Sequence, residues 1–159
     1  MASGFLSDLD IRQVGWAKRR AVWMTLAPLR YRSEALGGRV VLVPAEFVTD
    51  LASVPRAPLA YLLAGGRGNR GAVVHDFPYQ FGYWVLDDGS RLEVRDKKVP
   101  DDVFHESLLA DPMSGVESGA LAGTMWAFVR GFGRGVWANN ESRATRLNPE
   151  WSANGGPEA

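Results

Sequence analysis

The first half of the chain alternates apolar and polar residues, a pattern typical of β-strands. Residues 20–32 carry this alternation, and Pro28 within them indicates an edge strand or a bend. A second apolar run occupies residues 39–43, after a turn rich in glycine. We predict that the two runs pair as an antiparallel hairpin, with residues 1–19 at the periphery of the fold.

In the second half, apolar residues recur at every third or fourth position, which indicates helices. The spacing predicts helices over residues 72–81, 100–110 and 115–132, with a small hairpin over 84–94 between the first two. Pro78 lies inside the first helix and predicts a kink or an early end there. Together these elements predict an α+β fold, in which an N-terminal β-hairpin or small antiparallel sheet packs on three or four helices.

Length and composition fit one folded domain followed by a polar segment. The chain has 159 residues, of which 46% are hydrophobic and 23% charged, enough apolar material for one core. After Gly135 the sequence becomes polar. We therefore predict a single globular domain over residues 1–135 and a C-terminal tail over 136–159 that is extended, or docked through Trp137 and Trp151.

The charge balance and the residue types argue against several functions. Lysine plus arginine and aspartate plus glutamate both number 18, so the sequence predicts no nucleic-acid partner. The absence of cysteine excludes disulfides and thiolate metal sites. No signal-peptide pattern and no apolar stretch of about 18 residues is present, so we expect no transmembrane segment and a cytoplasmic site of synthesis.

Candidate chemistry centres on the stretch GAVVHDFPY, which holds the only His-Asp pair of the chain. On a helix, His75 and Tyr79 share a face one turn apart, and Asp76 projects about 100° away from them. Near neutral pH an imidazole can take a proton from water if a carboxylate orients its other nitrogen. Asp102 on the next helix is the first candidate for that carboxylate, and Asp50 is the second.

A divalent cation would complete such a site. Asp76, with Asp50 as a second ligand, could hold Ca²⁺ or Zn²⁺ together with carbonyls of the glycine-rich loop at residues 65–71. Activated water and a cation-polarised carbonyl would then hydrolyse an ester or an amide. His105 is an alternative zinc ligand. The sequence predicts no organic cofactor.

A competing interpretation gives the same residues structural roles. His75 would then bond within the core, and Asp76 would meet an arginine. Asp50 would cap a turn or pair with Arg56. The residues alone leave both interpretations open.

The spacing His75-Asp76-x-x-Tyr79, followed one helix later by an aspartate, resembles the active site of secreted phospholipases A2. In that family the His is the general base, the adjacent Asp binds calcium, the later Asp orients the His, and the Tyr supports the later Asp. The resemblance implies these roles for His75, Asp76, Asp102 and Tyr79. The chain departs from the family in lacking its paired cysteines and in having Pro78 where a cysteine is expected.

A longer resemblance covers most of the chain. VPAEFVTDLASVPR, AVVHDFPY, DDVFHESLL and a glycine-rich helix that ends in AFVRGFG resemble a family of small uncharacterised proteins of tailed phages and prophages. This resemblance implies a phage setting and a site at the first two segments, with no reaction attached. It implies the host cytoplasm as the place of synthesis and the virion as a further location.

Two functions therefore compete. One is a phage-encoded, metal-assisted hydrolase of an envelope ester or amide, with His75, Asp102, Tyr79 and Asp50 as catalytic residues and Asp76 and Asp50 as metal ligands. The other is a virion, tail or assembly component without turnover, whose partners are other phage structural proteins and whose His, Asp and Arg cluster is structural. A cleft that reaches His75 would favour the hydrolase, and a sealed imidazole would favour the structural component.

Overall fold

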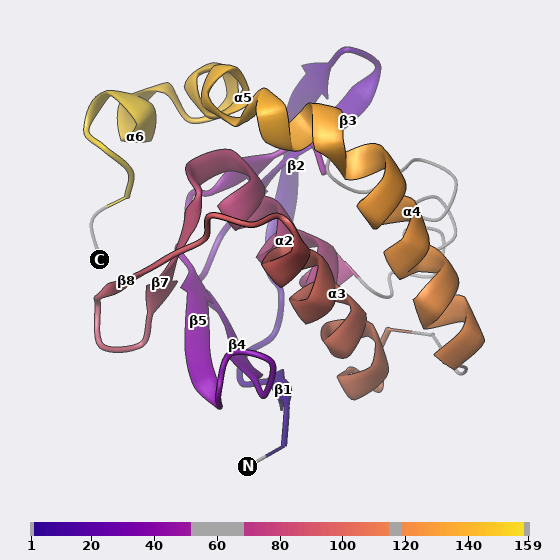
Figure 1. Cartoon of the computed structure of the whole chain (residues 1–159). Helices are drawn as coiled ribbons and strands as arrows, with labels where there is room; N and C mark the ends of the chain where they lie inside the picture. Colours follow the sequence, from indigo (N-terminus) through magenta and orange to yellow (C-terminus); the bar gives the residue numbers. More distant parts are fainter. Residues whose placement is uncertain (1, 52–68, 115–118, 158–159) are drawn as a thin grey trace.

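The computed structural model describes residues 2–51, 69–114 and 119–157. Within them, two antiparallel sheets built mainly from the N-terminal half are followed by helices, as Figure 1 shows, so the predicted α+β class is confirmed. The elements are β1 (Gly4–Phe5), β2 (Ile11–Ala17), β3 (Arg20–Thr25), β4 (Leu29–Ser33), β5 (Arg39–Val43), β6 (Val48–Thr49), α2 (Asn69–Phe81), β7 (Tyr83–Leu86), β8 (Arg91–Glu93), α3 (Lys98–Ala110), α4 (Gly119–Ala138), α5 (Asn140–Leu147) and α6 (Pro149–Ala153).

The larger sheet has the strand order β1-β4-β5-β7-β8, and its neighbouring strands are antiparallel. In its central hairpin Leu29 lies opposite Val43 and Tyr31 lies opposite Val41, and none of the four is exposed to solvent. Alternation along the strands places these side chains on one face, and α2 packs against β4, β5 and β7. Of the hairpin predicted between residues 20–32 and 39–43, only residues 29–32 pair with β5, as part of β4.

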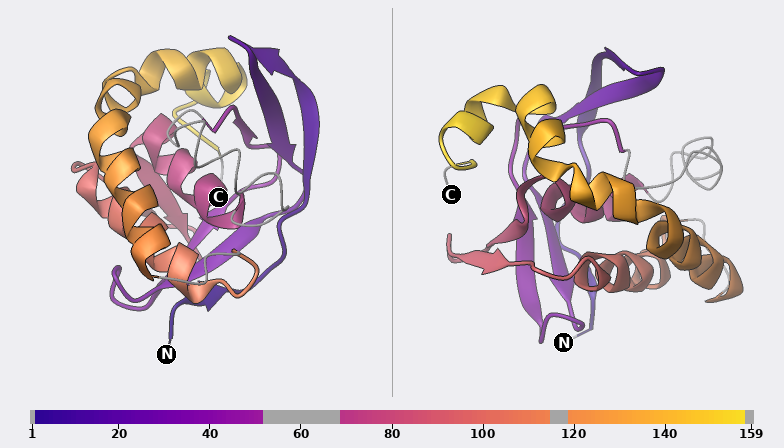
Figure 2. Two further views of the ribbon diagram at one scale, coloured as in Figure 1. Left: turned by 90° about the vertical axis from the view of Figure 1, so that its right-hand side faces the viewer. Right: turned by 45° about the horizontal axis from the view of Figure 1, so that its top comes forward.

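The smaller sheet joins β2, β3 and β6. Residues 1–19, expected at the periphery, contribute β2 to it, and Lys18 and Arg19 form the turn into β3 with positive φ angles of 47° and 64°. The single strand expected over 20–32 is divided between the two sheets, because the chain bends just before Pro28. Figure 2 shows the tip of the β2–β3 hairpin projecting beyond the larger sheet.

Helix α2 continues through Pro78 to Phe81, so the early end expected there is wrong. Proline has no N–H, so it leaves the carbonyl of Val74, four residues earlier, without its usual helical donor. The indole Nε1 of Trp84 donates to that carbonyl at 3.0 Å instead. The helix ends at Gly82, whose φ of 74° and whose N–H bond to the Pro78 carbonyl at 2.8 Å are typical of helix C-termini.

The C-terminal segment that the sequence predicts as a polar tail forms the end of α4 and the helices α5 and α6. Trp151 stacks on Phe47, with ring centroids 6.4 Å apart. The Asn148 side chain donates to the Val48 carbonyl at 2.8 Å and accepts from the Val48 N–H at 2.9 Å. These contacts hold the C-terminal segment against β6, and α5 packs against α2. Throughout the described ranges, each helix falls short of the length and apolar character that crossing a bilayer requires.

Candidate functional site

Helix α2 carries polar side chains into the protein interior. His75, Asp76, Tyr79 and Gln80 have exposed fractions between 0% and 2%, and they form two pairs in which the partners lie one helical turn apart. The ring centroids of His75 and Tyr79 are 4.3 Å apart. Gly71 lets α3 approach, because a Cβ at that position would collide with a side-chain hydroxyl on α3. One pair meets α3, and the other meets the C-terminal helices.

The first pair binds Asp101 on α3. His75 Nε2 lies 2.9 Å from Asp101 Oδ1, and the Tyr79 hydroxyl donates to the same oxygen at 2.6 Å. Lys97 Nζ donates to Asp101 Oδ2 at 2.7 Å, and Arg130 Nη1 lies 3.6 Å from that oxygen. This carboxylate has no solvent exposure. We call His75, Tyr79, Lys97 and Asp101 the Asp101 cluster.

The cluster shifts the pKa values of Asp101 and Tyr79. Burial alone would raise the pKa of Asp101, but the hydrogen bond and charge of His75, with Lys97 and Tyr79, outweigh it and hold that pKa below its ordinary value. Burial, and then the hydrogen bond to Asp101, raise the pKa of the Tyr79 phenol far above its ordinary value. At neutral pH Asp101 is therefore an ionised acceptor and Tyr79 a neutral donor.

The orienting contact that the sequence predicts for Asp102 is made by its neighbour Asp101. Asp102 instead pairs with Lys98 and accepts a hydrogen bond from Trp126 Nε1 at 3.1 Å. The reason is helix phase: Asp101 shares the buried face of α3 with Phe104 one turn later, whereas Asp102 projects about 100° away from it. The general-base chemistry of the imidazole remains a prediction.

The second pair on α2 meets Arg143 of α5. Arg143 Nη2 lies 2.6 Å from each Asp76 oxygen and 2.7 Å from Asp50 Oδ1, and Arg143 Nε lies 3.0 Å from the same Asp50 oxygen. The Thr49 hydroxyl and the Gln80 amide also donate to Asp76. Burial would lower the pKa of Arg143, but the charges of Asp76 and Asp50 outweigh it and raise that pKa. We call Arg143, Asp50 and Asp76 the Arg143 bridge.

The structure brings the two predicted cation ligands together through a guanidinium. Arg143 already compensates the charges of Asp50 and Asp76, so a metal ion bound at either carboxylate would have to displace it. In the parts of the chain that the structure describes, no three His, Asp or Glu side chains cluster closely enough to hold a metal ion. The predicted calcium or zinc site also draws on loop carbonyls of residues 65–68, outside the described residues, and stays a prediction.

The remaining sequence candidates lie elsewhere. His105, the alternative zinc ligand, packs near Trp126 with ring centroids 6.1 Å apart and is part of neither the cluster nor the bridge. Arg56 and loop residues 65–68 fall within 52–68, outside the described residues.

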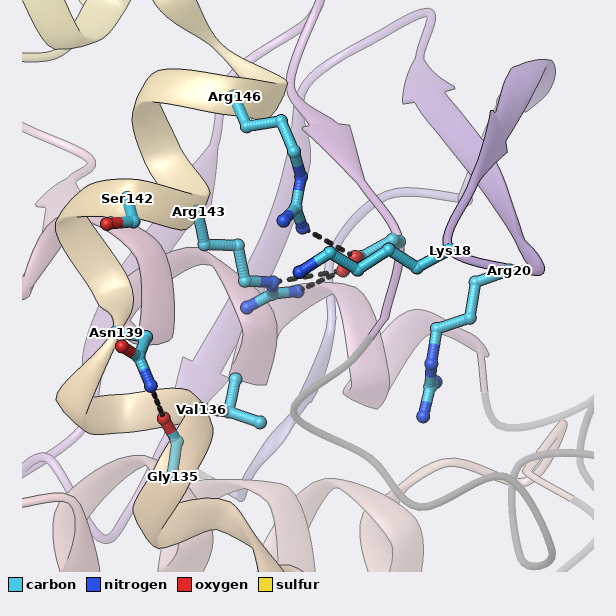
Figure 3. Close-up of a pocket in the computed structure, with 9 residues that line it drawn as sticks. Lys18, Arg20, Gly135, Val136, Asn139, Ser142, Arg143 and Arg146 are labelled. Carbon is cyan, nitrogen blue, oxygen red and sulfur yellow. Dashed lines mark hydrogen bonds and ion pairs between the residues drawn. The ribbon is translucent and has the colours of Figure 1, made fainter.

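The cluster and the bridge differ in their access to solvent. The His75 ring has an exposed fraction of 0%. Beside the Arg143 bridge, a cleft of about 500 Å³ opens between the β2–β3 hairpin and the helices α4 and α5, as Figure 3 shows. We call it the cationic cleft. Its lining residues include Lys18, Arg20, Asp50, Asn139, Arg143 and Arg146, and His75 is not among them.

Two residues that hold the site together do not appear among the sequence candidates, although each has a local signal. Asp101 lies three residues before the apolar Phe104, on the stripe that a helix buries. Arg143 lies four residues before Leu147 and next to Ala144, on the apolar side of an otherwise polar helix. A charged residue on a buried stripe is a candidate for an internal ion pair.

The close approach of α4 to Tyr79 gives a direct test of the Asp101 cluster. A Cβ at Gly133 would lie 2.6 Å from the Tyr79 hydroxyl oxygen and 3.3 Å from two ring carbons, and the bond to Asp101 keeps that ring in place. We predict that Gly133→Ala lowers the free energy of unfolding by about 1–3 kcal/mol. Gly131 in the same helix has nothing within 4 Å of an added Cβ, so Gly131→Ala should stabilise by about 0.5–1 kcal/mol. Urea denaturation measures both, and effects of equal sign and size would contradict the packing.

A family model described as protein of unknown function, DUF1353, matches residues 23–129. No curated protein and no solved structure matches the chain. The matched range is more than half of the chain. It includes Asp50, α2 and Asp101, and it ends before Arg143. The chain therefore belongs to the DUF1353 family of proteins of unknown function.

Proposed function

We propose that this chain is a structural or assembly component of a tailed phage or prophage and that it performs no turnover. The observation that carries the proposal is the burial of His75, whose ring is 0% exposed and whose Nε2 is engaged with Asp101 at 2.9 Å. A general base must reach the water or substrate from which it takes a proton. In this arrangement the imidazole is a hydrogen-bonding member of the core.

The connectivity of the two buried networks supports a structural role. The Asp101 cluster joins α2 to α3, and Lys97 extends it to α4 by donating to the Arg130 carbonyl at 3.2 Å. The Arg143 bridge joins α2, α5 and the residue after β6, Asp50. Buried, hydrogen-bonded charge networks can specify one arrangement of the elements that they connect. A body held in this way suits a part that assembles with others.

Exposed aromatic side chains supply candidate contact surfaces for such assembly. Trp16, next to the turn of the β2–β3 hairpin, is 73% exposed. On α4, Phe128 and Phe132 are 38% and 68% exposed, and their rings stack with centroids 5.8 Å apart. Large aromatic residues are enriched where proteins meet other proteins. The partners proposed here are other phage structural proteins, and the phage setting follows from the resemblance of VPAEFVTDLASVPR and AVVHDFPY to that family.

A second candidate, a hydrolase of an envelope ester or amide, is favoured by one observation. His75, Asp101 and Tyr79 form the base, orienting acid and supporting phenol that the resemblance to phospholipase A2 implies, with Asp101 in the place expected for Asp102. Water would have to reach the imidazole for this reaction. A Ca²⁺ or Zn²⁺ ion at Asp76 would also require the Arg143 bridge to open.

One pair of measurements separates the candidates. Purified wild-type, His75→Gln and Asp101→Asn proteins are assayed on phospholipid vesicles and peptidoglycan, with Ca²⁺, with Zn²⁺ and with chelator. His105→Gln is the control, because that imidazole belongs to neither network. We expect equal, background turnover in all four, and detection of the protein by mass spectrometry in purified particles or in their assembly intermediates. Metal-dependent turnover that both folded cluster variants lose and the control keeps would establish the hydrolase instead.

A further inference from the structure

The cationic cleft is lined by positively charged side chains from α5 and from the β2–β3 hairpin. Arg143 and Arg146 reach it from α5, and Lys18 and Arg20 reach it from the β2–β3 hairpin, as Figure 3 shows. Asp50 accepts from Arg143 Nε at 3.0 Å and from Arg146 Nη2 at 3.2 Å, which fixes both guanidinium groups at the cleft. Arg20 Nη1 donates to the backbone carbonyl of Leu51, two residues after β6, at 3.3 Å.

The charges of the cleft do not balance. Among the described lining residues, four side chains are cationic and Asp50 is the acidic one. Asp76, which also binds Arg143, adds a second carboxylate, so these described residues together carry an excess of two positive charges. A dianion would neutralise it.

Arg143 also has one nitrogen without a partner. Its Nη1 is buried and makes no hydrogen bond to any described residue, although the side chain is only 5% exposed and Nε and Nη2 are both bound. In Figure 3 this nitrogen is the one without a dashed line, on the side of the guanidinium that faces Val136. A buried donor without an acceptor costs free energy, and a ligand oxygen would recover it.

We propose that the cationic cleft binds the dianionic phosphate group of a small molecule. The phosphate oxygens accept from Arg146 at the cleft and, after a small shift of the buried Arg143 side chain, from its Nη1, and Lys18 approaches from the hairpin. Arginine forks match phosphate geometry, and a lysine adds a point charge. The volume of about 500 Å³ exceeds that of one phosphate and falls in the range of about 300–1,000 Å³ typical of small-molecule sites. The cleft does not include His75, so the binding is independent of the function proposed for that residue.

Isothermal titration calorimetry of the full chain at constant ionic strength tests the proposal with ribose 5-phosphate, inorganic phosphate and acetate. We expect saturable binding of ribose 5-phosphate and none of acetate. Lys18→Gln and Arg146→Gln are each expected to weaken binding by about tenfold, because each removes one cation and leaves the bond between Arg143 and Asp76 intact. Arg12→Gln, an exposed arginine on the same hairpin, is the matched control and should leave the affinity unchanged.

Each outcome decides the question. Tighter binding of ribose 5-phosphate than of inorganic phosphate supports an organic phosphate as the ligand, and equal binding supports free phosphate. The proposal fails if the folded wild type shows no saturable binding of either phosphate at millimolar concentration. It also fails if acetate binds as tightly as phosphate, or if both cleft variants bind like the control.

Discussion

The Arg143→Met variant is expected to lose about 3–5 kcal/mol of unfolding free energy at neutral pH. Arg143 is 5% exposed, and its Nη2 lies within 2.7 Å of oxygens of Asp50 and Asp76, which are 5% and 0% exposed. Methionine fills much of the volume of the arginine stem but leaves two buried carboxylates without their cation. This loss of unfolding free energy is larger than the net stabilisation that the intact bridge provides. In the bridge, the cost of desolvating the ions offsets most of their attraction, whereas the variant leaves the carboxylates buried without a cation.

Urea denaturation at neutral pH measures this loss. Arg146→Met is the matched control, because Arg146 is 39% exposed and contacts Asp50 once, at 3.2 Å, so its removal should cost less than about 1 kcal/mol. Combining Arg143→Met with Asp50→Asn and Asp76→Asn should restore part of the stability. Equal stability of the two arginine variants would refute the bridge as a buried ion network.

The sequence locates the centre of the fold because the relevant signals are local. Helical spacing places His75 and Tyr79 on one face, and their ring centroids are 4.3 Å apart in the structure. The hairpin predicted between residues 20–32 and 39–43 is present for residues 29–32, whereas residues 20–25 pair with strands of the other sheet. The continuation of α2 through Pro78 is not predicted by a local signal, because the donor that replaces the missing proline N–H is the side chain of Trp84 on the next strand. A residue pattern along one helix carries no information about that donor.

The identity of the orienting acid depends on helix phase. Asp101 and Asp102 are adjacent, and the choice between them turns on about 100° of rotation around α3. Both flank the apolar residues that the helix buries, so their polarity does not distinguish them. A lysine four residues earlier does not distinguish them either, because Asp101 pairs with Lys97 and Asp102 pairs with Lys98 at the same spacing.

Arg143 illustrates a limit of a different kind. It lies 67 residues from Asp76 and 93 from Asp50 along the chain, within the segment whose composition predicts a tail. Two carboxylates that approach each other in the interior require a positive charge. The predicted metal site reflects this requirement, because both of its ligands are carboxylates. Whether a metal ion or a side chain supplies the positive charge depends on which distant segment folds against the two carboxylates. In the structure a helix from the C-terminal segment brings a guanidinium there.

Asp101→Asn is expected to lower the free energy of unfolding by about 2–4 kcal/mol at neutral pH. The carboxylate has no solvent exposure and accepts from Tyr79 at 2.6 Å and from Lys97 at 2.7 Å, with His75 Nε2 at 2.9 Å. Asparagine keeps the shape but removes the negative charge, so the Lys97 ammonium, 13% exposed, loses its counterion. One of the three contacts must also face an amide N–H₂ group in place of an acceptor oxygen.

The pH dependence of this loss follows from the direction of the Asp101 pKa shift. Because the pKa is lower in the folded than in the unfolded protein, the carboxylate contributes its full stability above the unfolded value of about 3.9 and loses it as the pH falls further through the folded value. The asparagine side chain of the variant does not titrate, so the difference between wild type and variant should be constant near neutral pH and shrink below pH of about 4. Asp102→Asn is the matched control, since Asp102 is 33% exposed and its removal should cost less than about 1 kcal/mol. A larger loss from Asp102→Asn than from Asp101→Asn would mean that the neighbouring aspartate, and not Asp101, holds the imidazole in solution.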